Sequence, residues 1–221
     1  MKPKPWSFSA LDTFKTCPRQ YEAKYVSKSV QEEKSEQMLW GERVHKAFEL
    51  RQLDGTPLPD ELADHEPYMQ KLEALDGVHN VEQKIALNRQ LQPTNFFASD
   101  VWFRGIIDYI KVGESGAYVV DYKTGKPHQK FDQLMLFAIH TFILYPETDL
   151  VHVRFYWTQT FTETRSCYRR DDIKGIWNKF IPDLRQFAEA FKTDTWQPRQ
   201  SGLCNGWCPV KECEFWKPKR K

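Results

Sequence analysis

The sequence predicts an α/β protein with a mixed central β-sheet flanked by helices. Apolar residues recur at helical spacing near both ends and in the middle of the chain, and runs rich in β-branched and aromatic residues lie between these helices. The order of helices, a strand meander, a crossover helix and more strands is typical of this class. A chain of 221 residues with 40% hydrophobic residues can bury one core. We expect a single domain over residues 1–221, with a helical region at 1–75, a sheet with its crossover helix at 76–168, and a C-terminal helix with a cysteine-containing tail at 169–221.

Three helices are expected before the sheet. The segment 7–26 reads as one helix with Ser9 as its N-cap and an apolar face of leucine and aromatic residues. The segment 36–53 reads as a second helix. The stretch DGTPLPDE then breaks the pattern, and a short helix is expected to end near residue 75.

The strands follow, with one helix between them. The segments 101–113 and 117–123 are separated by a short turn, so they predict an antiparallel hairpin. An apolar stripe at helical spacing predicts the crossover helix. The full set of expected elements in this half is a strand at 80–88, the hairpin, a helix at 128–145, strands at 150–159 and 161–170, and a helix at 171–193.

Composition excludes several classes of protein. The hydrophobic content and 14% aromatic residues argue against disorder, and a net charge of +2 does not by itself indicate a nucleic-acid binder. No apolar run approaches the roughly 20 residues that cross a bilayer. The first residues lack the apolar stretch of a signal peptide. We expect a soluble, cytoplasmic protein with no membrane partner.

Two charged residues interrupt the end of an apolar strand in VVDYKTGK, residues 119–126. Side chains alternate along a strand, so Asp121 and Lys123 share one face and Tyr122 points to the other. A buried carboxylate and ammonium are costly unless they are paired or bind a metal. A strand end that reaches solvent, with a surface ion pair of little energetic value, would also explain them.

A second carboxylate, Asp108, lies in the apolar strand GIIDYI. The expected hairpin would bring Asp108 close to Asp121, with Lys123 beside them. Mg²⁺ takes one or two protein carboxylates and leaves room for water and a substrate phosphate. A lysine next to such an ion can orient water and offset charge in the transition state. Two carboxylates and a lysine therefore suit phosphodiester hydrolysis.

Five motifs in order resemble the PD-(D/E)XK nucleases, in particular their RecB-like branch, which includes the CRISPR adaptation nucleases and many phage exonucleases. The motifs are SFSALDTFKTCPRQYEAKY for the first helix, GERVHKAFE for G-x-x-x-H, GIID and DYK for the two central motifs, and QLMLF where the family has Q-x-x-x-Y. Each motif is weak alone, but the order and the gaps are fairly specific. The resemblance covers nearly the whole chain and implies a restriction-endonuclease-like core.

The resemblance implies a metal site. His45 would bind the ion through an imidazole nitrogen, Asp108 and Asp121 would bind it through their carboxylates, and Tyr122 would contribute its backbone carbonyl. The ion would be Mg²⁺ or Mn²⁺. A lone histidine on a helix is otherwise more often an ordinary surface or core residue.

The resemblance also implies catalytic roles. Lys123 would position the nucleophilic water, and Gln133 would contact DNA or Lys123. Glu82, in NVEQKI, stands where relatives often place a strand glutamate near the site. Position 137 is Phe instead of the family's Tyr, which leaves the role of that hydroxyl open.

Four of the five cysteines are distributed in a way that suggests a metal centre. Cys17 stands near the start, and Cys204, Cys208 and Cys213 cluster near the end. Thiolate sets select Zn²⁺ or an iron–sulfur cluster, and reduced thiols in an aromatic tail are the third alternative. Some RecB-like members hold a [4Fe–4S] cluster with one N-terminal and three C-terminal cysteines. The resemblance therefore favours a cluster over Zn²⁺, although the spacing differs from the commonest C-x₂-C-x₅-C form.

Together these features predict a divalent-metal-dependent DNA nuclease. An exonuclease acting on single- or double-stranded ends in phage or bacterial recombination, repair or processing fits best, with a helicase or recombination protein as a possible partner. The alternatives are a structure-specific endonuclease and a catalytically silent scaffold that binds DNA or a helicase.

Overall fold

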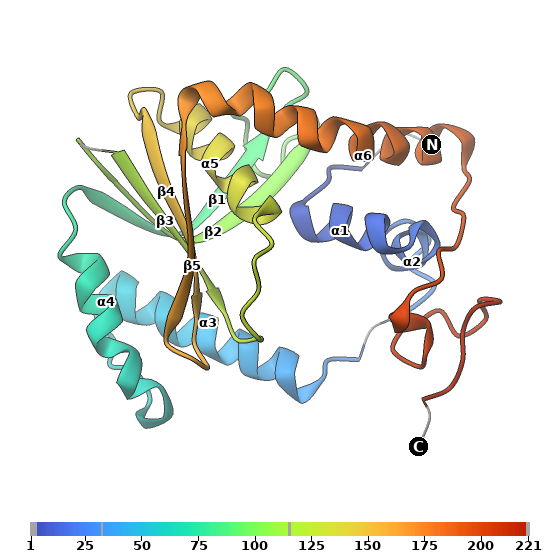
Figure 1. Ribbon diagram of the computed structural model, residues 1–221, viewed down its shortest axis with the longest axis horizontal. Helices are drawn as coiled ribbons and strands as arrows, with labels where there is room; N and C mark the ends of the chain where they lie inside the picture. The colour runs from blue at the N-terminus through green and yellow to red at the C-terminus, as the bar shows by residue number, and fades with distance from the viewer. Residues whose placement is uncertain (1–3, 32, 115, 220–221) are drawn as a thin grey trace. The chain divides into compact units, whose positions relative to one another are not determined.

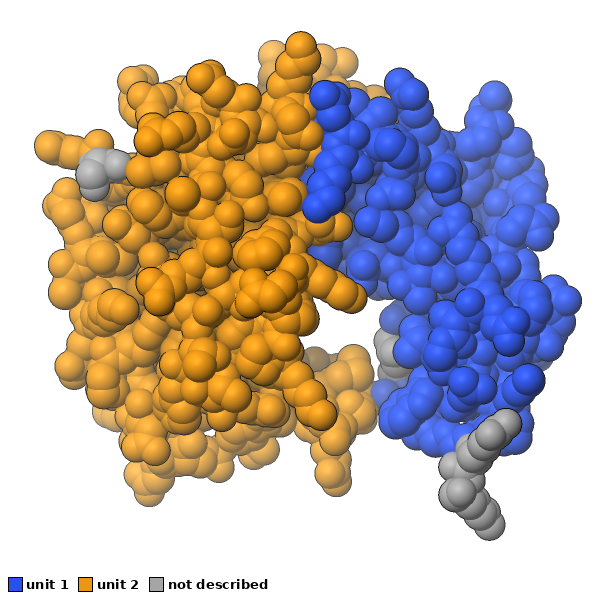
Figure 2. All heavy atoms as spheres, viewed as in Figure 1, with its two compact units in different colours: residues 1–33, 177–221 blue, residues 34–176 orange. Residues whose placement is uncertain are grey.

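The computed structural model describes residues 4–31, 33–114 and 116–219. The chain forms two compact units (Figure 2). Unit 1 combines the two ends of the chain, residues 1–33 and 177–221, and unit 2 is the continuous segment 34–176. The expectation of one domain over residues 1–221 stays a prediction.

Unit 2 is built on a five-stranded sheet in the order β1-β2-β3-β4-β5 (Figure 1). Neighbouring strands are antiparallel except β3 and β4, which are parallel. A parallel pair needs a crossover connection, and α5 provides it. The bounds are Val78–Leu87 for β1, Phe103–Gly113 for β2, Gly116–Lys123 for β3, Asp132–Leu144 for α5, Leu150–Trp157 for β4 and Thr162–Arg169 for β5. The predicted mixed sheet flanked by helices is confirmed.

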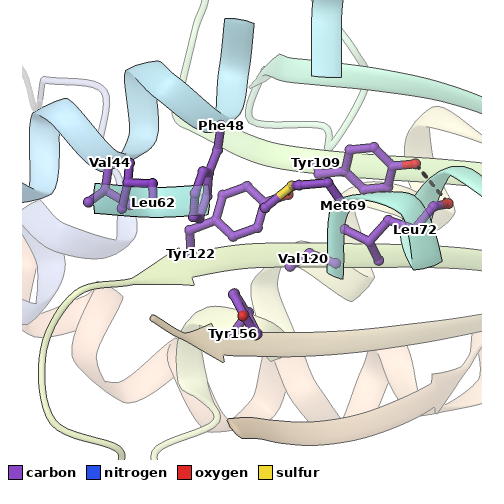
Figure 3. Close-up of a cluster of buried hydrophobic side chains, with 9 residues drawn as sticks. All are labelled: Val44, Phe48, Leu62, Met69, Leu72, Tyr109, Val120, Tyr122 and Tyr156. Atoms are coloured by element: carbon purple, nitrogen blue, oxygen red, sulfur yellow. Dashed lines mark hydrogen bonds between the residues drawn. The ribbon is translucent and has the colours of Figure 1, made fainter. Parts of the chain in front are cut away.

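Two helices cover one face of this sheet, and α5 lies on the other (Figure 1). They are α3, Glu36–Asp54, and α4, Glu66–Glu73, joined through a 3₁₀ helix at Asp60–His65. Their apolar side chains meet those of the sheet in one buried cluster (Figure 3), formed by Val44, Phe48, Leu62, Met69, Leu72, Tyr109, Val120, Tyr122 and Tyr156. Burying a side chain such as Phe48, which is 0% exposed, contributes about 1.5–3 kcal/mol.

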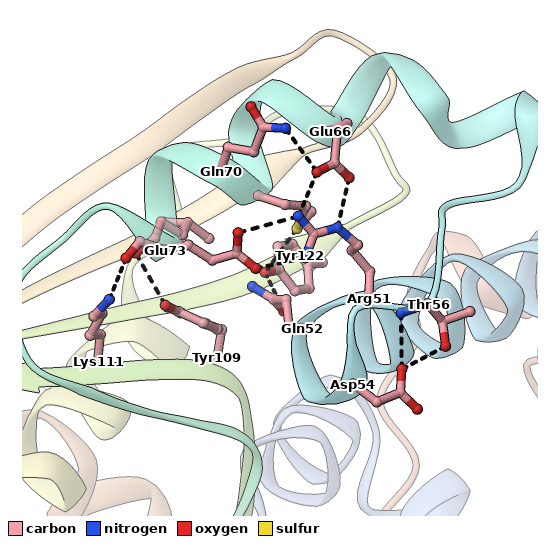
Figure 4. Close-up of polar contacts among 12 residues, drawn as sticks. Arg51, Gln52, Asp54, Thr56, Glu66, Gln70, Glu73, Tyr109, Lys111 and Tyr122 are labelled. Carbon is pink, nitrogen blue, oxygen red and sulfur yellow. Dashed lines mark hydrogen bonds and ion pairs between the residues drawn. The ribbon is translucent and has the colours of Figure 1, made fainter.

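Polar contacts fix α3 against α4 and the sheet (Figure 4). Arg51 donates to Glu66 at 2.8 Å and to Glu73 at 2.6 Å, so one guanidinium joins both ends of α4. The hydroxyl of Tyr122 donates to the side-chain carbonyl of Gln52 at 2.9 Å. Tyr122 is thereby held on the helix-covered face, as strand alternation predicts for a residue between Asp121 and Lys123.

The crossover helix α5 is apolar around most of its circumference, as expected for a buried helix. Phe137, where the family motif has a tyrosine, is 4% exposed and belongs to the core. The first turn of α5 carries Gln133, which is only partly buried. The packing of α5 therefore fixes the position of Gln133 relative to β3.

Unit 1 contains α1, Phe8–Thr16, α2, Pro18–Tyr21, and a π-helix at Glu22–Val26, so the expectation of one helix over 7–26 was wrong. Cys17 is extended, with φ −160° and ψ 110°, because a residue before proline avoids the helical region. The N-cap of α1 is Ser7, whose hydroxyl accepts from the Ala10 N–H, and not Ser9.

The rest of the chain is also helical, apart from the tail. A 3₁₀ turn at Arg170–Asp172 leads into α6, Ile173–Thr193, which begins in unit 2 and continues in unit 1, and a last 3₁₀ turn covers Gly202–Cys204. Within the described part of the chain, no helix combines the length and the apolar character that a membrane crossing needs.

Candidate active site

Two carboxylates meet where β2 and β3 separate. The pairing of these strands ends at Tyr109 and Val120, one residue short of Asp108 and Asp121. The Tyr122 N–H then donates to the Asp108 carboxylate at 2.7 Å, so a side chain takes the place of a backbone acceptor. Asp108 is 9% exposed and Asp121 3%.

Helix α3 brings His45 to this point. The His45 Nδ1 atom lies 3.3 Å from the Asp108 carboxylate. Burial alone would lower the pKa of His45, but the hydrogen bond to Asp108 and its charge outweigh burial and raise the pKa. Gly41 lies one turn earlier on α3. A Cβ added there would stand 3.2 Å from the Thr124 hydroxyl, so glycine lets α3 lie close to the residue that follows β3.

Glu82 reaches the same point from β1. In the β1–β2 ladder, Glu82 lies opposite Asp108, between the pairs Val81–Tyr109 and Gln83–Ile107, but these two residues do not pair. The φ angle of Glu82 is +51°. A non-glycine residue in this left-handed region costs of order 1–3 kcal/mol, and such strain clusters at functional sites. Burial is the main cause that raises the pKa of Glu82, and the charge of Asp108 raises it further.

Donor atoms of His45, Glu82 and Asp108 lie within 4.8 Å of one another. Carboxylate oxygens suit Mg²⁺ and Mn²⁺, and an imidazole nitrogen is tolerated better by Mn²⁺. With Asp121 nearby, three acidic side chains converge, and like charges at this distance call for a cation. The donor set therefore fits a divalent metal ion.

A second group of side chains surrounds Asp121. Gln133 donates from its amide nitrogen to Asp121 at 2.9 Å, and its carbonyl accepts from the Lys123 ammonium at 3.0 Å. Lys123 also forms an ion pair with Asp121. Burial raises the pKa of Asp121 to about 6, the charge of Lys123 opposes this, and Asp108 adds to it. The glutamine thus orients both charged groups of the strand.

The structure brings the seven residues expected at the site into two adjoining groups in unit 2. His45, Glu82 and Asp108 form the first, and Asp121, Lys123 and Gln133 form the second. Tyr122 joins the groups through its N–H, whereas metal binding by its carbonyl stays a prediction. No sequence signal predicts the left-handed conformation of Glu82, because glutamate is not a residue that favours it.

The four cysteines expected to bind a metal lie together in unit 1. Cys17, Cys204, Cys208 and Cys213 line one pocket. The Arg199 N–H donates to the Cys17 sulfur at 3.4 Å, and the Ser201 N–H to the Cys204 sulfur at 3.4 Å. Burial raises the pKa of the Cys208 thiol, and the three other thiols add to this effect. The fifth cysteine, Cys167 in β5, is exposed and belongs to unit 2.

Two comparisons relate the chain to known proteins. A family model described as the PD-(D/E)XK nuclease superfamily matches residues 5–213. The chain resembles the crystal structure of a candidate exonuclease from Eubacterium rectale, with a TM-score of 0.55, 11% identity, and coverage of 95% of this chain and 86% of that one. It also matches the crystal structure of SSO0001, with a TM-score of 0.44, 13% identity, and coverage of 97% and 87%.

At 11% identity the Eubacterium rectale structure shows a shared fold and nothing more. No curated protein matches the sequence. The family match is of a different kind, because its span of residues 5–213 includes all residues of both candidate sites. Nucleases of this superfamily use divalent metal ions and cleave DNA. The chain belongs to the PD-(D/E)XK nuclease superfamily.

Proposed function

We propose that this nuclease is a divalent-metal-dependent exonuclease of the RecB-like branch that degrades DNA from its ends. The observation that carries the proposal is the approach of His45, Glu82 and Asp108 to within 4.8 Å of one another, beside a lysine held by Asp121 and Gln133. The order of the motifs supports the branch. It also supports a role in phage or bacterial recombination, repair or processing, with a helicase or recombination protein as partner.

His45, Glu82, Asp108 and Asp121 would hold the ion, which we propose is Mn²⁺ or Mg²⁺. When bound, such an ion supplies a Lewis acid for the phosphate and lowers the pKa of a bound water. The imidazole in the donor set makes Mn²⁺ at least as good as Mg²⁺. The carboxylates also repel the phosphate that is to be cleaved, and the bound cation would neutralise them.

Lys123 carries the chemistry that the protein itself supplies. Its ammonium is held by Gln133 at 3.0 Å and lies 5.0 Å from the ring centre of Phe155, so its position is restricted from two sides. From there it can donate a hydrogen bond to the attacking water and offset negative charge in the transition state. Gln133 acts as a positioning residue, because it contacts both Lys123 and Asp121.

In unit 1 we propose a [4Fe–4S] cluster bound by the four cysteines that line the pocket. A zinc tetrahedron with bonds of about 2.3 Å places its sulfur atoms only about 3.8 Å apart. Among the residues that the structure describes, no three of these thiols lie within 4.8 Å of one another. The wider spacing favours a cluster, whose irons separate the thiolates. N–H groups directed at cysteine sulfurs are also typical of cluster sites.

A panel of DNA substrates tests the proposed activity. Purified protein is incubated with end-labelled single strands, end-labelled duplexes and a covalently closed circle, each with Mg²⁺, Mn²⁺ or EDTA. We expect linear DNA to be degraded with either ion, the circle to survive, and EDTA to stop the reaction. Cutting of the circle would make the enzyme an endonuclease. DNA binding without cleavage under every condition would leave the silent scaffold.

A further inference from the structure

The loop between β1 and β2, residues 88–102, exposes an aromatic side chain. Phe97 is 75% exposed, and its ring meets that of Phe96 edge to face, with centroids 5.2 Å apart and an interplanar angle of 83°. Ile106, on β2, is 41% exposed. Single exposed apolar residues need no explanation, whereas an exposed ring grouped with cations indicates a binding surface.

Two cations lie against these rings. Lys84 Nζ is 5.9 Å from the ring centre of Phe96, and the Arg104 guanidinium carbon lies 5.3 Å from Phe96 and 5.9 Å from Phe97. Within residues 4–31, 33–114 and 116–219, neither cation forms an ion pair with a carboxylate. We call Lys84, Phe96, Phe97, Arg104 and Ile106 the aromatic-basic patch. Its positive charge is therefore available to an anionic ligand.

Hydrogen bonds hold the loop in shape. The side-chain oxygen of Asn95 accepts from the Phe97 N–H at 3.0 Å, a turn that presents the phenyl ring. Thr94 donates from its hydroxyl to Asp100 at 2.9 Å and from its N–H to the Ala86 carbonyl at 3.0 Å. A surface ordered before binding loses less entropy when its ligand arrives.

The aromatic-basic patch adjoins the candidate active site along the strands. Lys84 pairs with Ile106 and Ala86 pairs with Arg104 in the β1–β2 ladder, and alternate residues share a face. Lys84 and Ile106 are two residues from Glu82 and Asp108, which corresponds to about 7 Å along a strand. Arg104 lies about 14 Å from Asp108 by the same measure. The patch therefore has the length to guide a few nucleotides toward the carboxylates.

We propose that the aromatic-basic patch is a subsite for single-stranded DNA, an inference that rests on the proposed nuclease function. Unpaired bases stack on Phe97 and Phe96, while Lys84 and Arg104 contact the phosphates between them. A duplex would not use the rings in this way, because its bases are already stacked on one another. Two unpaired cations beside exposed rings fit a polyanion with exposed bases better than they fit a protein surface.

Binding measurements on the full-length protein test this proposal. Fluorescence anisotropy in EDTA, where the metal-dependent reaction is stopped, compares a labelled oligo-dT of about 15 nucleotides with a duplex of equal length. Phe97→Ala should weaken single-strand binding about 5- to 150-fold, the range that corresponds to stacking of one base, and leave duplex binding within about twofold. Phe97→Trp should retain single-strand binding. Because Phe97 is exposed, neither variant should change the melting temperature.

Charge and apolar controls separate the two parts of the subsite. Lys84→Gln should reduce the slope of log affinity against log salt for the single strand by about 0.7, the contribution of one phosphate contact, whereas Phe97→Ala should not. Val78→Ala changes an exposed apolar residue at the other end of β1, and Arg165→Gln an exposed cation on β5, so both should bind like wild type.

The outcomes distinguish this proposal from the proposed nuclease function. Wild-type single-strand binding by Phe97→Ala, with wild-type protein still cleaving DNA in Mn²⁺, would overturn the subsite alone. An equal loss of duplex binding would also overturn it, because stacking on unpaired bases would not be the cause. Selective loss in Phe97→Ala supports the subsite even if wild-type protein cleaves none of the substrates.

Discussion

The backbone N–H of Tyr122 is bonded to the carboxylate of Asp108 at 2.7 Å, and this bond ties the two central strands together where their ladder has ended. The same Asp108 oxygen lies 3.3 Å from His45 Nδ1, so one carboxylate oxygen links β3 to α3. The buried ring of Tyr122, bonded to Gln52, makes the anchor rigid. The geometry of the site thus depends on a residue whose side chain lies on the opposite face of the sheet.

Replacing Lys123 should separate catalysis from metal binding. We expect Lys123→Ala to lower the rate of DNA cleavage by about 10²–10³, the usual effect of losing one donor that stabilises the transition state. Mn²⁺ affinity should stay close to that of wild type, because Lys123 is not a ligand. Lys192→Ala, which removes an exposed lysine of α6, is the matched control. Cleavage by Lys123→Ala at the wild-type rate would show that the lysine is only an ion-pair partner of Asp121.

Replacing Asp108 should weaken metal binding. Loss of a group that merely orients a ligand costs about 10–100-fold in affinity, so Asp108→Asn should weaken Mn²⁺ binding by at least about tenfold. Titration with Mn²⁺ followed by electron paramagnetic resonance measures free ion directly. Asp149→Asn makes the same chemical change at an exposed carboxylate, with a side chain 88% exposed, and should bind like wild type. Equal affinities of the two variants would exclude Asp108 as a ligand.

Replacing Cys208 should remove the proposed cluster without removing any residue of the candidate active site. Protein purified without oxygen is expected to be brown and to contain iron, and Cys208→Ser should lose both the colour and part of its thermal stability, because ligand bonds couple to folding. Cys167→Ser changes an exposed thiol and should do neither. Anaerobic wild-type protein with zinc and no iron would show that the thiols bind zinc, and protein with neither metal would leave reduced thiols in a packed tail.

His140 should make the protein sensitive to acid. Burial lowers its pKa to about 3, and the Leu136 carbonyl opposes this in part. Above pH 6.5 the group is neutral in both folded and unfolded chains. As pH falls from 6.5 toward 3, the unfolded chain binds a proton that the folded chain does not, so stability falls by about 1.4 kcal/mol per unit.

Urea denaturation at two pH values measures this effect. Between pH 7 and pH 5, the wild-type free energy of unfolding should fall by about 2 kcal/mol more than that of His140→Leu. Carboxylates titrate in both proteins, so their contribution to the free energy of unfolding cancels in the difference. Parallel pH profiles for the two proteins would contradict the buried, neutral histidine.

Much of the fold and of the site was open to prediction because their signals are local. Strand alternation separated Tyr122 from Asp121 and Lys123, and the short turn predicted the hairpin that carries Asp108. Motif order located Gln133 and His45. These residues act from regular elements, whose periodicity is written in neighbouring positions.

The remaining features depend on tertiary packing. Nothing in the sequence around Glu82 indicates its left-handed backbone, which the arrangement of its neighbours must impose. The exposure of Phe97 was equally hidden, because an aromatic residue in a loop is expected to turn inward. By contrast, Pro18 is a local signal for the helix break at Cys17, and it outweighs the apolar spacing that predicts one helix over 7–26.

Unit 1 is built from two segments that lie far apart in the sequence, and this has a consequence for biosynthesis. The segment 34–176 leaves the ribosome as one continuous piece, so its sheet can form during translation, at about 5–20 residues per second. Cys17 emerges early but meets Cys213 only after residue 213 has been synthesised. Any metal delivered to these thiols must therefore arrive after synthesis of the sheet is complete. A product of translation that stops before residue 204 would carry the candidate active-site residues without the cysteine site.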